Sequence, residues 1–427
     1  MKRNAIEKLI DWKQGEPRTP LFLSGVRGCG KTYLAMDFAK SFFEGALYLN
    51  FEQKNAQSEA LLAEIRKEQT KRGGALEAFP AGFSLAAFSE RICTLFDVPL
   101  EYRRNFLIVL DEVCGDGVLW DLLVSRAGET LDFCVLVISS QMPALPAQSL
   151  HLNLYPFTFE EFLFATGQEW YSEVIRGHFQ TNHRIPGIVH EELVDRFDDY
   201  LCTGGMPAAI NEYLCFEAVD NLPEIHQRYF GHVLYRIQKH HAEGEALKMR
   251  QILEVIPAQL EKENQKFQYR MIRKGATGAL YQNAIQALCK EQLIWLCRRQ
   301  DKEEAFKIFP ADIGFLYAVT GKGILGKEQD RGFRRLLLGC YVMQALSACG
   351  YPAEFWESLS QARVDFLIGQ EGVWIPIEVK TTENARSKSI GVYRASHEVP
   401  YSIKISYHNF DFSGGVRSIP YYAIFCL

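Results

Sequence analysis

The sequence predicts an α/β protein with an N-terminal doubly wound parallel sheet, a helical middle region and a smaller α/β segment at the C-terminus. Three observations lead to this prediction. Apolar runs alternate with amphipathic stretches over the first 160 residues, this strand pattern fades from about residue 157, and it returns beyond residue 305. With 427 residues, 48% of them hydrophobic and 23% charged, the chain has a globular composition, which excludes a mainly disordered protein.

Four continuous apolar runs form the predicted N-terminal sheet. Such runs are typical of strands that are buried on both faces, as in a parallel sheet. The segments between them, such as 31–43 and 119–129, have helical spacing, which produces the β-α-β-α order of a doubly wound domain. The predicted strands are 21–25, 46–52, 105–112 and 132–140.

Helical spacing dominates the middle of the chain, and strands return near its end. Predicted helices cover 157–165, 190–201, 207–216, 249–260, 278–294 and 332–350. Predicted strands cover 295–299, 353–358, 363–370, 373–380 and 422–427, with a charged turn at 381–388. We therefore expect four domains, at 1–156, 157–218, 219–304 and 305–427.

A glycine-rich loop follows the first predicted strand and precedes a helix. It matches the pattern GxxxxGK[ST], in which backbone N–H groups curve around phosphate oxygens and the helix adds its positive N-terminal end. Lys31 would reach the β- and γ-phosphates, and Thr32 would offer its hydroxyl to Mg²⁺. The flanking strand and helix favour this interpretation over a glycine-rich turn without nucleotide. The predicted nucleotide-binding residues are Gly25, Val26, Arg27, Gly28, Cys29, Gly30, Lys31, Thr32 and Tyr33.

Two acids end the strand at 106–110, about 80 residues after this loop. Asp111 would hold Mg²⁺ through its water shell, and Glu112 would polarise the attacking water. The alternative is a surface acidic pair at a strand end. The loop makes the first interpretation stronger, because both motifs are expected at the carboxyl edge of one sheet.

The next predicted strand ends in Ser139-Ser140, and Ser140 is the preferred candidate to sense the γ-phosphate or orient water. Ordinary capping of the strand end is the alternative. No arginine finger is identifiable. Arg27, Arg126 and Arg184 are each expected to be surface arginines rather than a finger.

A second constellation occupies two adjacent predicted strands near the C-terminus. Asp365 and Glu378 would share a divalent metal, and Lys380 would position or activate a water for attack on a phosphodiester. Residues 378 and 380 project to one face because strand side chains alternate. This constellation resembles that of the restriction-endonuclease-like nuclease fold, which usually adds an acid from the preceding helix and one before residue 364. This chain has Leu338-Gly339-Cys340 and Arg363 at these places. Both departures weaken metal binding, so a fold that does not cut is favoured over an active nuclease.

The chain resembles predicted prokaryotic ATPases of the AAA+ superfamily with a C-terminal domain of unknown function that has a restriction-endonuclease-like core. The resemblance spans nearly all the chain. It rests on GVRGCGKT, IVLDE, LYPFTFEEFL (154–163), YLCTGGMPAAI (200–210), IPAQLEKENQKFQY (256–269), FPADIGFL (309–316) and the segment 364–390. The first two motifs are shared by many ATPases, whereas the ordered set is specific.

The resemblance implies an ATPase core at 1–156, a lid-like helical region at 157–218 and a restriction-endonuclease-like domain at 305–427. It also implies a winged-helix-like element within 249–299. Basic residues gather there beside two aromatic ones, and such a patch would suit a phosphate backbone, although a solvated helix face explains it equally well. These residues are Lys262, Lys266, Arg270, Arg273 and Lys274, with Phe267 and Tyr269.

Charge and cysteine content restrict the setting of the protein. The net charge is −5 and the pI about 6.1, which excludes a basic nucleic-acid coat. The apolar runs are too short to cross a bilayer, and the N-terminal residues lack the apolar core of a signal peptide. Eleven cysteines at irregular spacings, without a CxxC pair, suggest thiols in a reducing compartment. We therefore expect a cytoplasmic protein.

The predicted function is Mg²⁺-dependent ATP binding and hydrolysis that drives a conformational switch. One alternative is an ATP-regulated nuclease that uses the C-terminal constellation. Another is an adaptor that binds ATP without turnover and contacts nucleic acid or protein. The partner acted on and the oligomeric state stay open.

Overall fold

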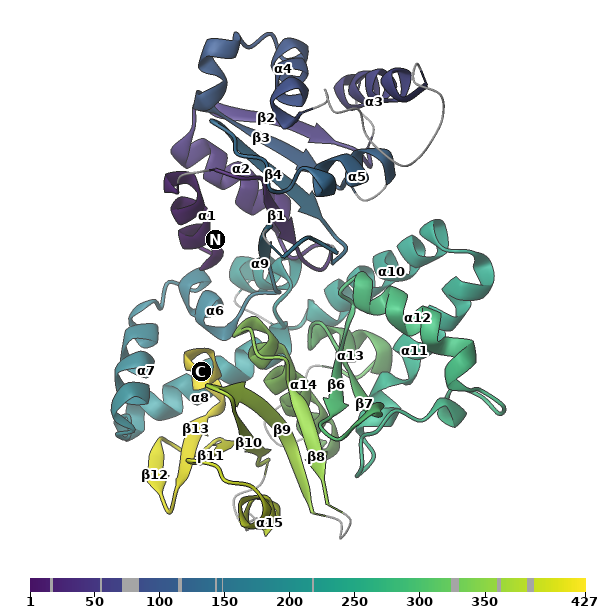
Figure 1. Cartoon of the computed structure of the whole chain (residues 1–427). Helices are drawn as coiled ribbons and strands as arrows, with labels where there is room; N and C mark the ends of the chain where they lie inside the picture. Colours follow the sequence, from purple (N-terminus) through teal and green to yellow (C-terminus); the bar gives the residue numbers. More distant parts are fainter. Residues whose placement is uncertain are drawn as a thin grey trace. The chain divides into compact units, whose positions relative to one another are not determined.

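The computed structural model describes residues 1–15, 18–53, 56–70, 84–113, 117–142, 144–147, 149–216, 219–323, 330–358, 362–381 and 388–427. The chain divides into two compact units (Figure 1). The N-terminal unit contains Lys2–Tyr155 and the short segment Lys290–Gln292. The C-terminal unit contains Met1, Pro156–Cys289 and Leu293–Leu427.

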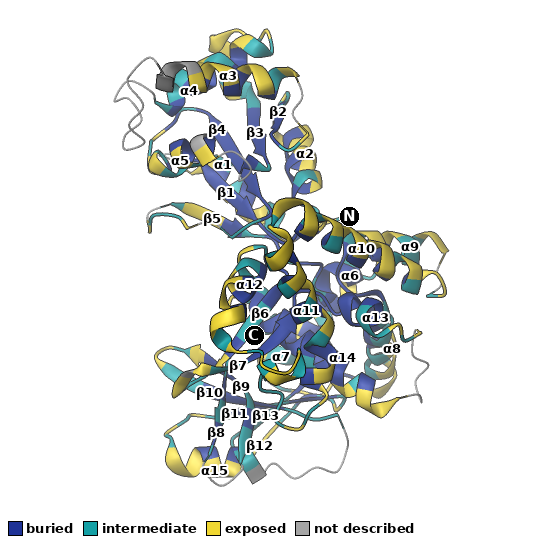
Figure 2. Ribbon diagram, turned by 90° about the vertical axis from the view of Figure 1, so that its right-hand side faces the viewer, coloured by how far each residue is buried: buried dark blue, intermediate teal, exposed yellow. Residues whose placement is uncertain are grey.

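The N-terminal unit is built on a five-stranded parallel sheet in the order β2-β3-β4-β1-β5. Its strands are β1 (Leu21–Ser24), β2 (Gly45–Asn50), β3 (Phe106–Asp111), β4 (Cys134–Ser139) and β5 (Leu150–Asn153). Every residue of β1 and β4 is buried, as expected for central strands covered on both faces, and Figure 2 shows both in the buried colour. This confirms the four predicted strands and the parallel sheet.

Helices connect these strands. They are α1 (Ala5–Gln14), α2 (Lys31–Phe42), α3 (Ala56–Thr70), α4 (Leu85–Leu95), the 3₁₀ helix η1 (Leu100–Asn105) and α5 (Gly117–Ser125). The apolar core beneath them contains Phe22, Leu49, Phe88 and Leu110. The strand β5 was not predicted, because two of its four residues are exposed and its short sequence has no continuous apolar run.

The C-terminal unit contains an eight-stranded mixed sheet in the order β12-β13-β11-β10-β9-β8-β6-β7. Its strands are β6 (Ile294–Arg299), β7 (Lys302–Pro310), β8 (Glu354–Glu357), β9 (Arg363–Gln370), β10 (Val373–Val379), β11 (Ser402–Ser406), β12 (Asp411–Ser413) and β13 (Val416–Pro420). β6 pairs with β8, so the hairpin formed by β6 and β7 belongs to this sheet. The expected domain boundary at 304–305 falls inside β7, and the division into four domains stays a prediction.

Helices make up the rest of this unit. They are α6 (Phe159–Ala165), α7 (Trp170–Thr181), α8 (Gly187–Thr203), α9 (Pro207–Phe216), α10 (Leu222–His240), α11 (Glu243–Leu260), η3 (Tyr269–Met271), α12 (Gly278–Lys290), α13 (Gly314–Thr320), α14 (Arg331–Ala348), α15 (Lys388–Ser396) and η4 (Tyr421–Cys426). The predicted helices are confirmed, although their ends differ by up to six residues, as at the start of α11. The prediction of a strand at 422–427 is wrong, because this buried apolar run forms the 3₁₀ helix η4, and periodicity does not separate short buried strands from helices. The predicted turn at 381–388 lies mostly outside the described residues.

Two segments that are far apart in the sequence meet in a buried polar cluster of the C-terminal unit. The carboxylate of Asp312 accepts hydrogen bonds from the backbone N–H of Gly205 at 2.6 Å and of Gly314 at 2.9 Å. A Cβ atom at Gly205 would lie 2.6 Å from the carbonyl oxygen of Phe157, so no side chain fits there. Burial raises the pKa of Asp312 to about 6, while both hydrogen bonds lower it. The Gly-Gly turn at 203–207 is therefore a packing contact that holds this fold.

The described helices include none that is both long and apolar enough to cross a membrane. The cysteines within the described ranges are free thiols.

Candidate nucleotide-binding site

The glycine-rich loop joins β1 to α2 at the carboxyl edge of the N-terminal sheet. Gly28 and Gly30 have φ angles of 83° and 100°, a left-handed region that side chains rarely adopt. A Cβ atom at Gly25 would lie 2.2 Å from the carbonyl oxygen of Leu154. Each of these three glycines is thus required by the backbone, and together they allow the sharp curvature that phosphate binding needs.

Lys31 begins α2 and is buried, with 5% of its surface exposed. Its ammonium donates to the carbonyl oxygens of Gly25 at 2.8 Å and Val26 at 3.3 Å, and to Ser140 Oγ at 3.1 Å. The charge therefore lies inside the loop. Phosphate oxygens there would replace neutral acceptors with charged ones, which hydrogen-bond more strongly to an ammonium.

Asp111 ends β3 and faces the first turn of α2. Its Oδ2 atom accepts hydrogen bonds from Thr32 Oγ1 at 2.8 Å and from the Tyr48 hydroxyl at 2.7 Å. Its Oδ1 atom is buried without a hydrogen-bond partner. Burial raises the pKa of Asp111, although the bonds from Tyr48 and Thr32 lower it. A buried carboxylate with one open acceptor beside a hydroxyl fits a divalent cation that prefers oxygen ligands.

Glu112 follows Asp111 and turns the chain with a φ of 55°. Its carboxylate accepts a hydrogen bond from Ser140 Oγ, and Arg27 Nη1 lies 3.5 Å from Glu112 Oε1. Because β4 lies between β1 and β3, Ser140 stands between Lys31 and Glu112 and hydrogen-bonds to both. The structure therefore brings Lys31, Thr32, Asp111, Glu112 and Ser140 together.

Three polar residues from the end of β2 also reach this edge, and the sequence interpretation did not include them. Tyr48 donates to Asp111, Asn50 Nδ2 donates to the Tyr48 hydroxyl at 3.0 Å, and Glu52 pairs with Arg27 at 2.6 Å. Burial is the largest cause that raises the pKa of Tyr48 to about 12, so the phenol keeps the proton that it donates. Polar residues at alternate positions of 48–52 indicate a polar face in this strand. The sequence does not show that this strand lies beside β3, so it does not connect them with Asp111.

The remaining loop residues differ in exposure. Val26 and Cys29 are buried, and the thiol of Cys29 contacts the Leu154 carbonyl oxygen at 3.3 Å. Cys29 is thus a small residue that packs inside the loop. Tyr33 on α2 is 59% exposed. Arg126 forms an ion pair with Glu129 at 3.1 Å.

The C-terminal constellation is also assembled, on β9 and β10, but its groups satisfy one another. Asp365 Oδ2 accepts from the backbone N–H of Val379 at 2.8 Å, and Glu378 Oε1 forms an ion pair with Lys380 at 2.5 Å. Glu378 Oε2 is buried without a hydrogen-bond partner. The helix α14 contains no acidic residue that could join them. No group of three or more His, Cys, Asp or Glu suited to a metal ion occurs among the described residues.

The basic residues at 262–274 are largely engaged within the chain. Lys266 pairs with Glu357 at 2.8 Å, and Arg273 Nε donates to the Tyr281 hydroxyl at 3.2 Å. Lys262 and Arg270 both donate to the side chain of Gln268. These contacts support a structural role more than a phosphate-binding patch.

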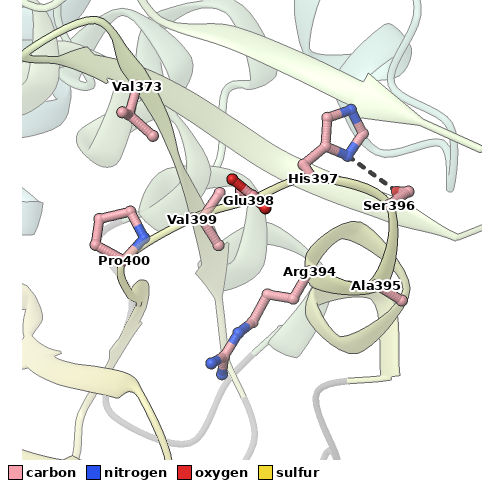
Figure 3. Close-up of a pocket in the computed structure, with 8 residues that line it drawn as sticks. All are labelled: Val373, Arg394, Ala395, Ser396, His397, Glu398, Val399 and Pro400. Carbon is pink, nitrogen blue, oxygen red and sulfur yellow. Dashed lines mark hydrogen bonds between the residues drawn. The ribbon is translucent and has the colours of Figure 1, made fainter.

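In two cavities of the C-terminal unit, polar side chains are engaged with other groups of the protein. A cavity of about 590 Å³ lies beside α15 (Figure 3). There Arg394 donates to the Gly414 carbonyl oxygen at 2.9 Å, and His397 Nδ1 lies 2.9 Å from Ser396 Oγ. A second cavity, of about 450 Å³, adjoins Lys380. Its half-buried Arg334 is already paired with Asp198 at 2.5 Å.

Comparison with known families supports the class of the N-terminal unit. Residues 17–163 match the family described as "AAA domain". Together with the parallel sheet and the glycine-rich loop, this match supports an ATP-binding ATPase with a P-loop fold. Residues 194–325 and 336–424 match families described as "Domain of unknown function", DUF8612 and DUF4143. A restriction-endonuclease-like fold for the second of these segments stays a prediction.

Individual relatives are distant. The chain is 24% identical over 221 residues to an uncharacterized protein of Methanocaldococcus jannaschii. The aligned region covers 48% of this chain and 42% of that protein. The chain thus spans less than half the length of this curated relative.

Among solved structures, the chain is similar to the Walker-type ATPase of Pyrococcus abyssi. The identity is 15%, with 75% of this chain and 95% of that chain covered and a TM-score of 0.46. It is also similar to the ORC1 protein of Aeropyrum pernix in complex with DNA. There the identity is 14%, the coverage 78% and 92%, and the TM-score 0.25. Neither similarity is close enough to transfer an activity.

Proposed function

We propose that this protein binds ATP with Mg²⁺ and hydrolyses it to ADP and phosphate, and that the nucleotide acts as a conformational switch. One observation carries the proposal. Hydrogen bonds join Lys31, Thr32, Asp111, Glu112 and Ser140 at one sheet edge, beside a loop whose glycines suit phosphate. The match of residues 17–163 to the AAA domain supports the ATP-binding part.

Each side chain has a distinct task in this proposal. Lys31 and the loop N–H groups would bind the β- and γ-phosphates, and Thr32 and Asp111 would hold Mg²⁺. When bound, Mg²⁺ would supply positive charge that neutralises the phosphate oxygens. Glu112 would orient a water whose oxygen bonds to the γ-phosphorus, while the bond from that phosphorus to the bridging oxygen breaks. The water's proton passes to Glu112 or to the released phosphate, and ADP keeps the bridging oxygen.

The switch follows from the position of the γ-phosphate. Residues of β1, α2, β2, β3 and β4 all reach this edge, so a γ-phosphate there would hold several loops that relax after cleavage. The partner that responds to this change would be a protein or a nucleic acid.

Two measurements test the proposal. Titration with a fluorescent ATP analogue in Mg²⁺ should give saturable binding that Lys31→Ala weakens by about 10²-fold or more, because the buried ammonium is lost. Steady-state phosphate release should fall by about 10²- to 10³-fold in Glu112→Gln, while binding changes little.

The control variant is Arg104→Ala, which removes an exposed ion pair with Asp132 at the amino end of β3 and should behave as wild type. Absence of binding by the wild-type protein would refute the proposal. Binding with phosphate release that Glu112→Gln leaves unchanged would instead support a binding adaptor.

For the C-terminal unit we propose a restriction-endonuclease-like core that does not cut. The order α14-β8-β9-β10-α15-β11, with Asp365 and Glu378 on paired strands, supports the core. The pairing of Glu378 with Lys380, and the lack of a third acid beside them among the described residues, argue against metal-dependent cutting. Degradation of DNA or RNA in Mg²⁺ or Mn²⁺ that Asp365→Ala abolishes would overturn this view.

A further inference from the structure

Arg27 lies in the middle of the glycine-rich loop and joins two acids from different strands. Its Nη2 atom is 2.6 Å from Glu52 Oε2, beyond the end of β2, and its Nη1 atom is 3.5 Å from Glu112 Oε1, beyond the end of β3. One guanidinium thus contacts two carboxylates, at the edge where the other site residues meet. Arg27 is one of the predicted nucleotide-binding residues but was not expected to act as an arginine finger, and its two ion pairs lie at the site.

The ion pairs of Arg27 are suited to exchange. The arginine side chain is 40% exposed, and the side chains of Glu52 and Glu112 are 19% and 17% exposed. Ion pairs in contact with water are weak, because the charges are screened and long side chains lose freedom when they pair. A terminal phosphate carries more negative charge than a carboxylate, and its oxygens match the planar fork of a guanidinium.

The partner of Arg27 also matters for Glu112. The Oε1 atom of Glu112 accepts a hydrogen bond from Ser140 Oγ and lies 3.5 Å from Arg27 Nη1, a contact between charges rather than a hydrogen bond. The positive charge of Arg27 beside this oxygen would compete with a water molecule for the carboxylate. Departure of Arg27 would remove this competition, while Ser140 would still hold the side chain in position.

We propose that Arg27 is the γ-phosphate-sensing arginine of this site and is supplied by the same chain. It holds Glu52 and Glu112 as in the structure, moves to the terminal phosphate when ATP binds, and so frees Glu112 to orient water. ADP has no such phosphate and leaves Arg27 on the two glutamates. This inference rests on the proposed ATPase function and adds the residue that distinguishes ATP from ADP.

The decisive experiment measures the affinities for ATP and ADP, and the turnover rate, in wild type, Arg27→Ala, Arg27→Lys and Glu52→Gln. Arg27→Ala should reduce the ratio of ATP affinity to ADP affinity by about 10-fold. It should also lower turnover by about 10²-fold or more. Its ADP affinity should stay within about three-fold of wild type, since ADP makes no contact with Arg27. Arg27→Lys should restore only part of both losses, because an ammonium lacks the planar fork.

Glu52→Gln should change ATP affinity in the opposite direction. It removes one competitor for Arg27, so ATP affinity should rise by about two- to five-fold while ADP affinity stays unchanged. Arg104→Ala is the matched control, because it also breaks an arginine–carboxylate pair of this unit but lies at the amino end of β3. Turnover per chain should also be independent of protein concentration, since no second copy supplies the arginine.

The outcomes separate this inference from the proposed function. If wild type neither binds nor hydrolyses ATP, the proposed function fails and the inference falls with it. If wild type is active but Arg27→Ala lowers ATP and ADP affinity equally, Arg27 only shapes the loop and the inference is wrong. Unchanged turnover in Arg27→Ala would overturn it as well, and Glu52→Gln keeps the test open if the alanine variant does not fold.

Discussion

Both units of this protein carry carboxylates at or near strand ends, and the two sets are partnered differently. At the edge of the N-terminal sheet, Asp111 keeps one oxygen open beside Thr32, and a glycine-rich loop adjoins it. In the C-terminal unit, Asp365 accepts a backbone N–H and Glu378 is paired with Lys380. Glu378 also keeps one open oxygen, but its other oxygen is paired with the ammonium of Lys380, whereas the other oxygen of Asp111 accepts only from hydroxyl groups. Similar residue types form a ligand site only where the surrounding chain leaves complementary groups free.

The largest effect expected from this contrast is on turnover. Glu112→Gln and Glu378→Gln each neutralise one glutamate that has an open or exchangeable oxygen. The first should reduce phosphate release by about 10²- to 10³-fold, and the second should change it by less than about two-fold, because only Glu112 would orient water. A steady-state phosphate-release assay on both variants checks this. A comparable loss in Glu378→Gln would break the contrast between the units.

The next largest effect concerns Asp312, which is buried like Asp111 but accepts two backbone N–H groups. Asp312→Asn places an amide NH₂ against one of these donors, so it should destabilise the protein by about 1–3 kcal/mol. Chemical denaturation measures this loss. A stability equal to wild type would mean that the cluster at the Gly-Gly turn does not hold the fold.

The same residue predicts a pH dependence. Its pKa in the folded protein, about 6, lies above the ordinary value of 3.8. Between pH 3.8 and about 6, Asp312 keeps its proton in the folded protein, whereas the unfolded chain has released it. The contribution of this group to the free energy of unfolding is therefore complete below pH 3.8, and it is lost as the pH rises through about 6. Comparison of wild type with Asp312→Asn across this window should isolate that slope. If Asp312→Asn keeps the same change of stability with pH as wild type, other titratable groups cause that change.

A smaller effect should sharpen the account of the metal site. Tyr48→Phe removes one donor to Asp111 and leaves Asn50 without the hydroxyl it contacts. Groups that orient a metal ligand typically contribute about 10-fold or more to metal affinity, so we expect the Mg²⁺ dependence of ATP-analogue binding to shift by about 10-fold. Lys31 is untouched, so binding at saturating Mg²⁺ should approach wild type. An unchanged Mg²⁺ dependence would limit Tyr48 to packing.

Much of the fold was predictable because its signals are local. The continuous apolar runs of β1, β3 and β4 indicate buried strands without any knowledge of their neighbours. The edge strand β5 was not predicted, and the 3₁₀ helix η4 was wrongly predicted as a strand, because their local sequences do not indicate their structure. An exposed edge needs no apolar run, and a short buried apolar run suits either geometry.

The sequence by itself determined the loop, because each required glycine and the lysine after it follow within eight residues, and it determined which strand ends carry acids. Only the tertiary structure decided that Tyr48 reaches Asp111, that Arg27 lies between Glu52 and Glu112, and that Glu378 is paired with Lys380. The physical reason is that a hydrogen-bond or ion-pair partner depends on the lateral order of strands and the direction of side chains. That order is set by packing across the whole sheet, whereas motif spacing describes one strand end at a time.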